Sequence, residues 1–194
     1  SQFFVVQAHT MYGDSMDPVI KNGETVLMNR LPYVLGAPKV GQVAMYHPNK
    51  MHIYLLGGHF EVRVDTWIDQ PMGIGRVVAG PGQVVERRGG VLMVDGKPLQ
   101  EGFLPRRQNF PEQFRLQAEP DEYIILINQA DNFLRPPGIH GKTEDFWQSL
   151  GAPASSQLSW ELQNWEQVCR VPRKQFIGRI SLVVEPSISR RVLR

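Results

Sequence analysis

Ser15 is the residue around which a specific chemistry can be argued. It lies in the segment Gly13-Asp14-Ser15-Met16-Asp17-Pro18. Glycine and proline favour tight turns, and a serine on a turn can expose its hydroxyl and its backbone N–H together. Attack of that hydroxyl on a peptide carbonyl needs a base and N–H donors for the oxyanion, and a buried lysine can replace histidine as the base. The segment suits acyl transfer, although a β-turn closed by an Asp or Ser side chain explains it equally well.

The elements that must position this serine are predicted to be short strands. Apolar runs rich in β-branched residues recur between turn signals, which is typical of strands. They cover residues 25–28, 42–46, 91–94, 123–127 and 176–184. The 18 glycines and 15 prolines favour tight turns over long helices. We therefore expect a mainly β fold, a barrel or sandwich of short antiparallel strands.

Two hairpins are indicated by their turn residues. Residues 60–65 alternate between apolar and polar side chains, and Gly57-Gly58 connects them to an apolar run at 52–56. Asp95-Gly96 follows the run at 91–94, and the chain is expected to return from Lys97.

The segment 143–169 departs from the strand pattern. Thr143 can cap a short helix that ends at Gly151, and Ser155 or Ser156 can cap a second one. The second helix carries Leu158, Leu162, Trp165 and Cys169 at helical spacing. Three of the four tryptophans lie in this segment, at 147, 160 and 165. Aromatic residues at this spacing favour burial against the β core over an exposed docking surface.

Composition limits the classes of function. The net charge of +2 is too small to predict a nucleic-acid partner. No apolar run is long enough for a transmembrane helix, and no histidine or cysteine cluster has metal-ligand spacing. The single Cys169 cannot form an internal disulfide and is expected to be a half-buried structural thiol. The 194 residues suit one domain, with a β core at 1–142 and 170–194 and a helical insertion at 143–169.

The order of segments resembles the signal peptidase I family along most of the chain. The serine segment is similar to the family's serine box, and 22–31 to the strand that follows it. Residues 38–46 resemble the next box, 75–82 the lysine box, 84–96 the following strand and hairpin, and 171–179 the closing strand. The resemblance implies Ser15 as nucleophile, with its own N–H and the region of Gly13 forming the oxyanion site.

The chain departs from the family pattern at the general base. The position of the base lysine falls on Gly75, which cannot accept a proton. A later box, usually Gly-Asp-Asn-Arg-Asp-Asn-Ser, falls on 127–133, where only Asp131 and Asn132 survive and Phe133 stands at the serine position. Lys50, His52, His59 and His140 are the alternative bases that the sequence offers.

Two functions from different classes follow. The chain is expected to be a catalytically impaired relative that binds an exported protein or extended peptide, or that joins a membrane complex; the alternative is an active serine endopeptidase with a non-standard base. A self-cleaving LexA-like domain fits less well, because no N-terminal DNA-binding helix pair is evident. The candidate binding residues are Met16, Pro18, Arg76, Asp131, Asn132 and Phe133. No metal or cofactor is expected, and the resemblance implies membrane association on the extracytoplasmic side, through an anchor that the given chain does not show.

Overall fold

The computed structural model is mainly β. It describes residues 5–11, 16–47, 51–55, 58–62, 72–100, 103–104, 110–127, 165–184 and 190–192, with the backbone alone for 51–55, 58–62 and 190–192. All strand pairings are antiparallel. The predicted mainly β class is confirmed.

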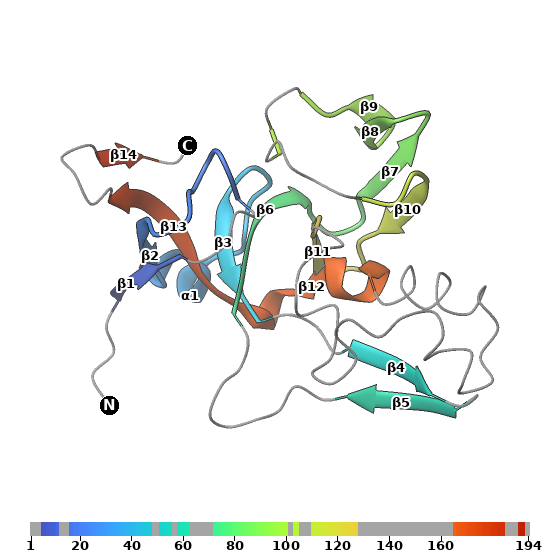
Figure 1. Ribbon diagram of the computed structural model, residues 1–194, viewed down its shortest axis with the longest axis horizontal. Coiled ribbons are helices and arrows are strands. Elements are labelled where there is room, and N and C mark those ends of the chain that lie inside the picture. Colours follow the sequence, from blue (N-terminus) through green and yellow to red (C-terminus); the bar gives the residue numbers. More distant parts are fainter. Residues whose placement is uncertain are drawn as a thin grey trace.

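An eight-stranded sheet forms the centre of the molecule (Figure 1). Its strands run, in spatial order, β1 (Val6–Thr10), β2 (Thr25–Asn29), β13 (Phe176–Val184), β3 (Val43–Tyr46), β6 (Gly73–Ala79), β11 (Glu122–Ile125) and β12 (Arg170–Pro172), and β14 (Arg190–Val192) pairs with β13. β1 and β12 stand at its two ends, so the described strands do not close into a barrel. The long strand β13 joins the two halves, because it pairs with both β2 and β3.

A smaller sheet packs beside β6 and β11. It has the order β10 (Phe114–Gln117), β7 (Val84–Arg88), β8 (Val91–Val94) and β9 (Lys97–Pro98). Asp95 and Gly96, which connect β8 to β9, have φ values of 49° and 74°. Positive φ at both central residues is the geometry that an Asp-Gly hairpin turn requires, so this predicted turn is confirmed.

A separate two-stranded sheet, β4 (Met51–Leu55) and β5 (Gly58–Val62), forms the other predicted hairpin. Two short helical elements lie on the main sheet, α1 (Leu31–Leu35) and the 3-10 turn η2 (Arg173–Gln175). Residues 165–169 form one helical turn. The rest of the predicted insertion at 143–164, with Trp147 and Trp160, lies outside the described residues.

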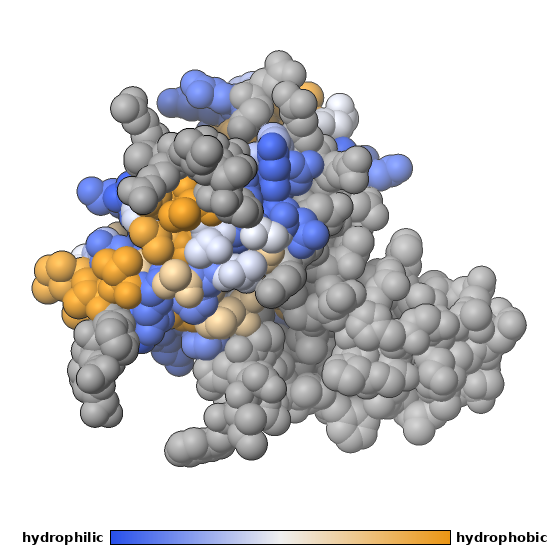
Figure 2. All heavy atoms as spheres, turned by 60° about the vertical axis from the view of Figure 1, so that its left-hand side comes forward, coloured by the Kyte–Doolittle hydropathy of each residue, from blue (hydrophilic) through white to orange (hydrophobic). Residues whose placement is uncertain are grey.

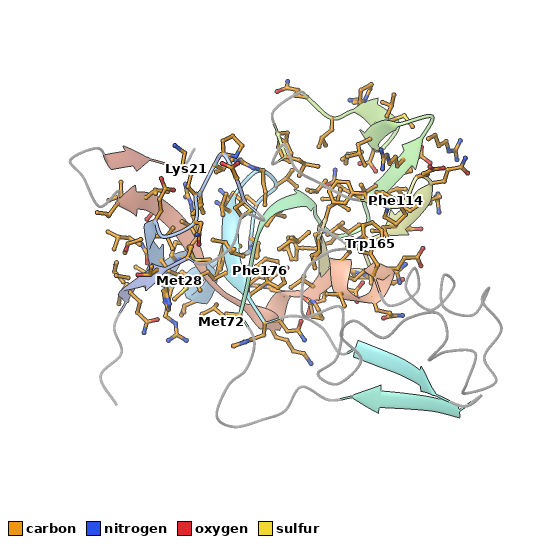
Figure 3. All side chains as sticks on the ribbon, viewed as in Figure 1. Lys21, Met28, Met72, Phe114, Trp165 and Phe176 are labelled. Atoms are coloured by element: carbon orange, nitrogen blue, oxygen red, sulfur yellow. The ribbon has the colours of Figure 1, made fainter. Side chains whose placement is uncertain are left out.

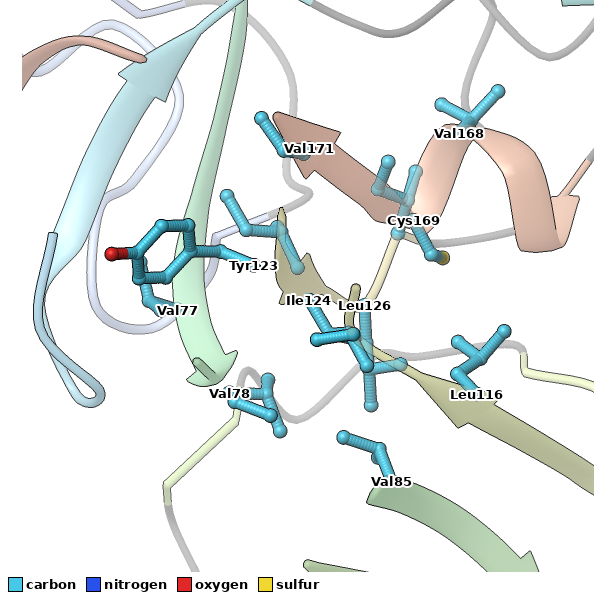
Figure 4. Close-up of a cluster of buried hydrophobic side chains, with 14 of the residues drawn as sticks. Val77, Val78, Val85, Leu116, Tyr123, Ile124, Leu126, Val168, Cys169 and Val171 are labelled. Carbon is cyan, nitrogen blue, oxygen red and sulfur yellow. The ribbon is translucent and has the colours of Figure 1, made fainter. Parts of the chain in front are cut away.

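Two apolar clusters fill the interior on either side of the central strands. The larger joins β6, β11 and β12 to the small sheet and to the turn at 165–169, and Figure 4 shows part of it. The smaller joins β2, β3 and β13 to the segment that follows Ser15. Figure 3 shows Phe114 and Trp165 side by side in the larger cluster and Met28 on the β1–β2 side. Both clusters reach β6, the strand that carries Gly75.

Candidate functional site

The structure describes both ends of the serine loop. Residues 12–15, including Gly13 and Ser15, lie outside the described residues. Met11 follows β1 and is fixed by two backbone hydrogen bonds: its N–H donates to the Glu24 carbonyl at 2.8 Å, and its carbonyl accepts from Gly23 at 2.8 Å. The buried Glu24 carboxylate in turn accepts the Lys21 N–H at 2.7 Å. The first end of the loop is therefore held by a tight turn.

The second end of the loop is buried. Met16 is a member of the smaller apolar cluster, and Met11 and Ile74 both pack against that cluster. Pro18, the other candidate beside the serine, is exposed. Met11 and Met16 at the two ends of the serine loop, and Ile74 beside Gly75, thus contact the same smaller apolar cluster.

Gly75 has no room for a side chain. It is buried on β6, paired with Ala44 of β3. A β-carbon built on Gly75 would collide with the Cγ2 methyl of Ile125 and would lie 3.8 Å from Cε1 of Tyr46. Ile125 and Tyr46 are each 1% exposed. The first part of the space that a lysine stem would need is therefore filled by the Ile125 methyl group, and the Tyr46 ring lies at ordinary van der Waals distance beside it.

Tyr46 covers the neighbouring glycine of the same strand face. It is paired with Gly73 across β3 and β6, and a β-carbon on Gly73 would lie 2.7 Å from Cζ of Tyr46. An aromatic ring packed over a cross-strand glycine is a stabilising arrangement in sheets. The ring also packs on Phe176, at 6.2 Å between centroids. The Tyr46 ring thus packs over Gly73 and lies beside Gly75.

Near Gly75, one edge of β6 has no partner among the described strands. Val77 exchanges hydrogen bonds with the β3 side, through Gln42 and Gly41. Because bonded groups alternate along an antiparallel strand, Ile74 and Arg76 direct their backbone groups to the opposite edge. There β11 pairs with β6 only at Val77 and Ala79, and no other described strand covers Ile74.

Arg76, a predicted binding residue, makes contacts within the protein. Its Nη1 donates to the Gly41 carbonyl at 2.8 Å, and its guanidinium lies 5.4 Å from the centroid of the Phe103 ring. Partial burial lowers its pKa. These contacts hold the side chain against the loop that precedes β3.

Trp165 supports the strand that carries Ile125. Its indole Nε1 donates to the Ile127 carbonyl at 2.6 Å, and its ring packs on Phe114 at 4.8 Å between centroids. The strand β11 ends at Ile125, two residues before the carbonyl that Trp165 binds. The prediction that the tryptophan segment is buried is met at Trp165, which is fully buried beside Cys169. Burial also raises the pKa of the Cys169 thiol.

The described part of the chain does not place any of the predicted alternative bases beside the serine loop. His52 and His59 lie on β4 and β5, whose side chains are not described, and Lys50 and His140 lie outside the described residues. Asp131, Asn132 and Phe133 lie outside them as well. Figure 1 shows β4 and β5 far from β1 in the view.

The sequence did not single out His9 of β1, whose Nε2 is buried with no hydrogen-bond partner in the described part of the chain.

Sequence reasoning also missed Tyr46 and Ile125. Both belong to strands that were predicted correctly, but pairing register decides which side chain lies over Gly75. The sequence signal that could have indicated Tyr46 was its position two residues after Ala44 on the same strand face.

Within the described ranges, no group of three or more acidic, histidine or cysteine side chains is placed to hold a metal ion, and no helix is long and apolar enough to cross a membrane.

Comparison with known proteins identifies the relatives of this chain. The family model "Signal peptidase, peptidase S26" matches residues 1–176. A probable signal peptidase I-1 of Synechocystis sp. is 32% identical over 136 residues, which are 68% of this chain and 61% of that protein. Signal peptidase IB of Staphylococcus aureus is 33% identical over 101 residues, which are 52% of this chain and 43% of that protein. The matches thus span roughly half of these curated relatives, and the chain belongs to the signal peptidase (peptidase S26) family.

Proposed function

We propose that this protein is a catalytically impaired signal peptidase relative that binds an extended segment of an exported protein at the outer side of the cytoplasmic membrane. The observation that carries the proposal is the filled space over Gly75, where the buried Ile125 side chain leaves no room for a β-carbon. A serine hydroxyl has a pKa far above neutrality and needs a neighbouring base to become a nucleophile. With the lysine position occupied by apolar groups, Ser15 is left without the base that the family resemblance requires.

The binding part of the proposal rests on the edge of β6 that no described strand covers at Ile74. An extended peptide can add to a sheet edge through main-chain hydrogen bonds, with side-chain pockets giving specificity. The Ile74 backbone faces such an edge, and Met11 and Met16 bring the serine loop to the cluster against which Ile74 packs. Peptide binding of this kind needs no lysine.

An acylation assay tests the loss of catalysis. A serine-directed acylating probe that labels Staphylococcus aureus signal peptidase IB serves as the reagent, so that a negative result is meaningful. We expect no labelling of this protein above that of its Ser15→Ala variant, measured by intact-protein mass spectrometry. Labelling that depends on Ser15 would establish the alternative function, an active endopeptidase with a different base, and His9→Gln would then test the half-buried imidazole of β1.

Variants that restore the lysine at position 75 test whether Ile125 is the reason why Ser15 lacks a base. Gly75→Lys alone should not restore labelling, because Ile125 occupies the path of the lysine stem. Gly75→Lys combined with Ile125→Ala and Phe133→Ser supplies the amine, its space and the supporting hydroxyl, and this variant should label above the parent. Gly75→Lys labelling as strongly as the triple variant would refute the role assigned to Ile125.

A binding assay tests the edge. The probe is a fluorescein-labelled peptide with the small-x-small pattern of an export cleavage site, and a scrambled peptide is its control. Fluorescence anisotropy should show binding that survives Ser15→Ala. Ile74→Pro removes the N–H at the free edge and should weaken binding by about tenfold, as expected for a lost hydrogen bond to a buried partner. Ile74→Val keeps the N–H and is the matched control; equal weakening in both variants would contradict edge pairing.

A further inference from the structure

His9 of β1 carries a buried nitrogen that has no hydrogen-bond partner in the described part of the chain. The atom is Nε2 of the imidazole, and the side chain as a whole is half-buried. The next residue, Thr10, shows the contrast: it is exposed, and its hydroxyl lies 3.4 Å from the hydroxyl of Thr25. A buried polar atom without a partner is costly, and such atoms are rare in folded proteins. The Nε2 atom is therefore a candidate contact for a bound molecule.

The pairing of β1 with β2 directs the His9 side chain toward the smaller apolar cluster. His9 is paired with Val26, which is fully buried in that cluster. Directly paired residues of a sheet project on the same face, so the imidazole faces the same apolar side chains. Met11 continues this face, because its N–H bond to the Glu24 carbonyl extends the pairing beyond Thr10. Met11 and Ile74 both pack against the cluster, so His9 and the β6 edge proposed to bind a peptide border the same apolar surface.

The smaller apolar cluster consists of aliphatic and methionine side chains. This holds for its buried members and for the partly buried residues that pack on it, as far as the structure describes them. Figure 2, which brings the β1 side of Figure 1 forward, shows apolar and hydrophilic residues close together on this face of the molecule. A side chain that enters apolar surroundings and covers a single nitrogen must either pair with that nitrogen or leave it unpaired. His9 can therefore discriminate between bound side chains of similar size.

We infer that His9 makes the proposed peptide site select a hydroxyl-bearing residue in the bound segment. A neutral imidazole nitrogen donates or accepts a hydrogen bond according to its tautomer, and a serine or threonine hydroxyl matches both cases because it can do either. A carboxylate only accepts, and it loses its hydration on entering an apolar cluster. An apolar side chain leaves Nε2 unpaired. The inference rests on the proposed peptide binding for its ligand, and it adds the residue that determines which peptide is preferred.

Three fluorescein-labelled peptides with the small-x-small pattern test the inference. One has alanine at both small positions, and the other two have serine at the first or at the second of them. Fluorescence anisotropy should show that one of the serine peptides binds about tenfold more tightly than the alanine peptide, as one hydrogen bond to a buried partner predicts. His9→Phe keeps a flat ring without nitrogen, so it should remove this preference and still bind the alanine peptide. Thr10→Val removes a hydroxyl from the opposite face of β1 and is the matched control, which should keep the preference.

The comparison of peptides on the unmutated protein does not depend on how any variant folds, and circular dichroism checks the folding of the two variants. Equal affinities of the unmutated protein for serine and alanine peptides would overturn the inference, as would a serine preference that survives His9→Phe. Both results leave the proposed function intact, because peptide binding that Ile74→Pro weakens would still stand. Failure of all three peptides to bind would overturn the proposed function and this inference with it.

Discussion

Two regions of the molecule carry apolar side chains where polar ones were expected, and their exposure gives them opposite consequences. At Gly75 on β6, where the resemblance places an amine, Ile125 fills the space and Tyr46 packs beside it, both with almost no exposure. On α1, where solvent favours polar groups, Val34 and Leu35 stand out by three quarters of their surface. Buried apolar groups close a site and stabilise the fold, whereas exposed ones add little stability and offer a contact surface.

The largest effect is expected from removing the ring over the glycines. Tyr46→Ala should lower the free energy of unfolding by about 3–5 kcal/mol, because it deletes a buried aromatic ring and leaves a cavity. Tyr46→Phe keeps the ring and should cost only about 0.5–1.5 kcal/mol. Urea denaturation measures both. Similar costs would show that the hydroxyl, and not the ring, holds this region.

Filling the space over Gly75 should be the next most costly change. Gly75→Ala forces a methyl group into Ile125 and should destabilise by about 1–3 kcal/mol, the range for overpacking. Gly80→Ala is the matched control on the same strand's end, because its β-carbon would meet only ordinary contacts at 3.7 Å or more. The control should be neutral or stabilise by up to about 1 kcal/mol through the unfolded state. An equally neutral Gly75→Ala would break the claim that the site is closed.

Removing the hydrogen bond from Trp165 to the Ile127 carbonyl should lower the free energy of unfolding by a smaller amount. Trp165→Phe leaves the buried Ile127 carbonyl without its donor and should cost about 1–2 kcal/mol of stability. Combined with Gly75→Ala, it should cost less than the sum of the two single changes if loosening β11 lets Ile125 shift. Additive costs in the double-mutant cycle would show that Trp165 does not govern the position of Ile125.

The smallest stability effect is expected at the exposed side chains of α1. Val34→Ser with Leu35→Ser should change the free energy of unfolding by no more than about 0.5 kcal/mol, as is usual for surface positions. Thermal and urea unfolding check this value. A loss as large as that of Gly75→Ala would mean that α1 belongs to the core and that the contrast between the two regions is false.

Much of the fold follows from local sequence patterns. Alternating or continuous apolar runs located the strands at 25–28, 42–46, 91–94 and 176–184 to within a residue at each end, and Asp-Gly located a turn. The strand at 123–127 was placed less well, since the observed strand β11 spans Glu122–Ile125. α1 was not predicted, since its five residues are too few to show a helical period.

The sequence by itself determined the family, the mainly β class and the absence of a lysine at position 75. Those features depend on residue identity and on order along the chain. Only the tertiary structure decided that Ile125 occupies the space over Gly75, that Tyr46 covers Gly73 and that Tyr33 packs inward while Val34 and Leu35 are exposed. These facts depend on strand register and on contacts between residues far apart in sequence, and a shift of one residue in register would reverse them.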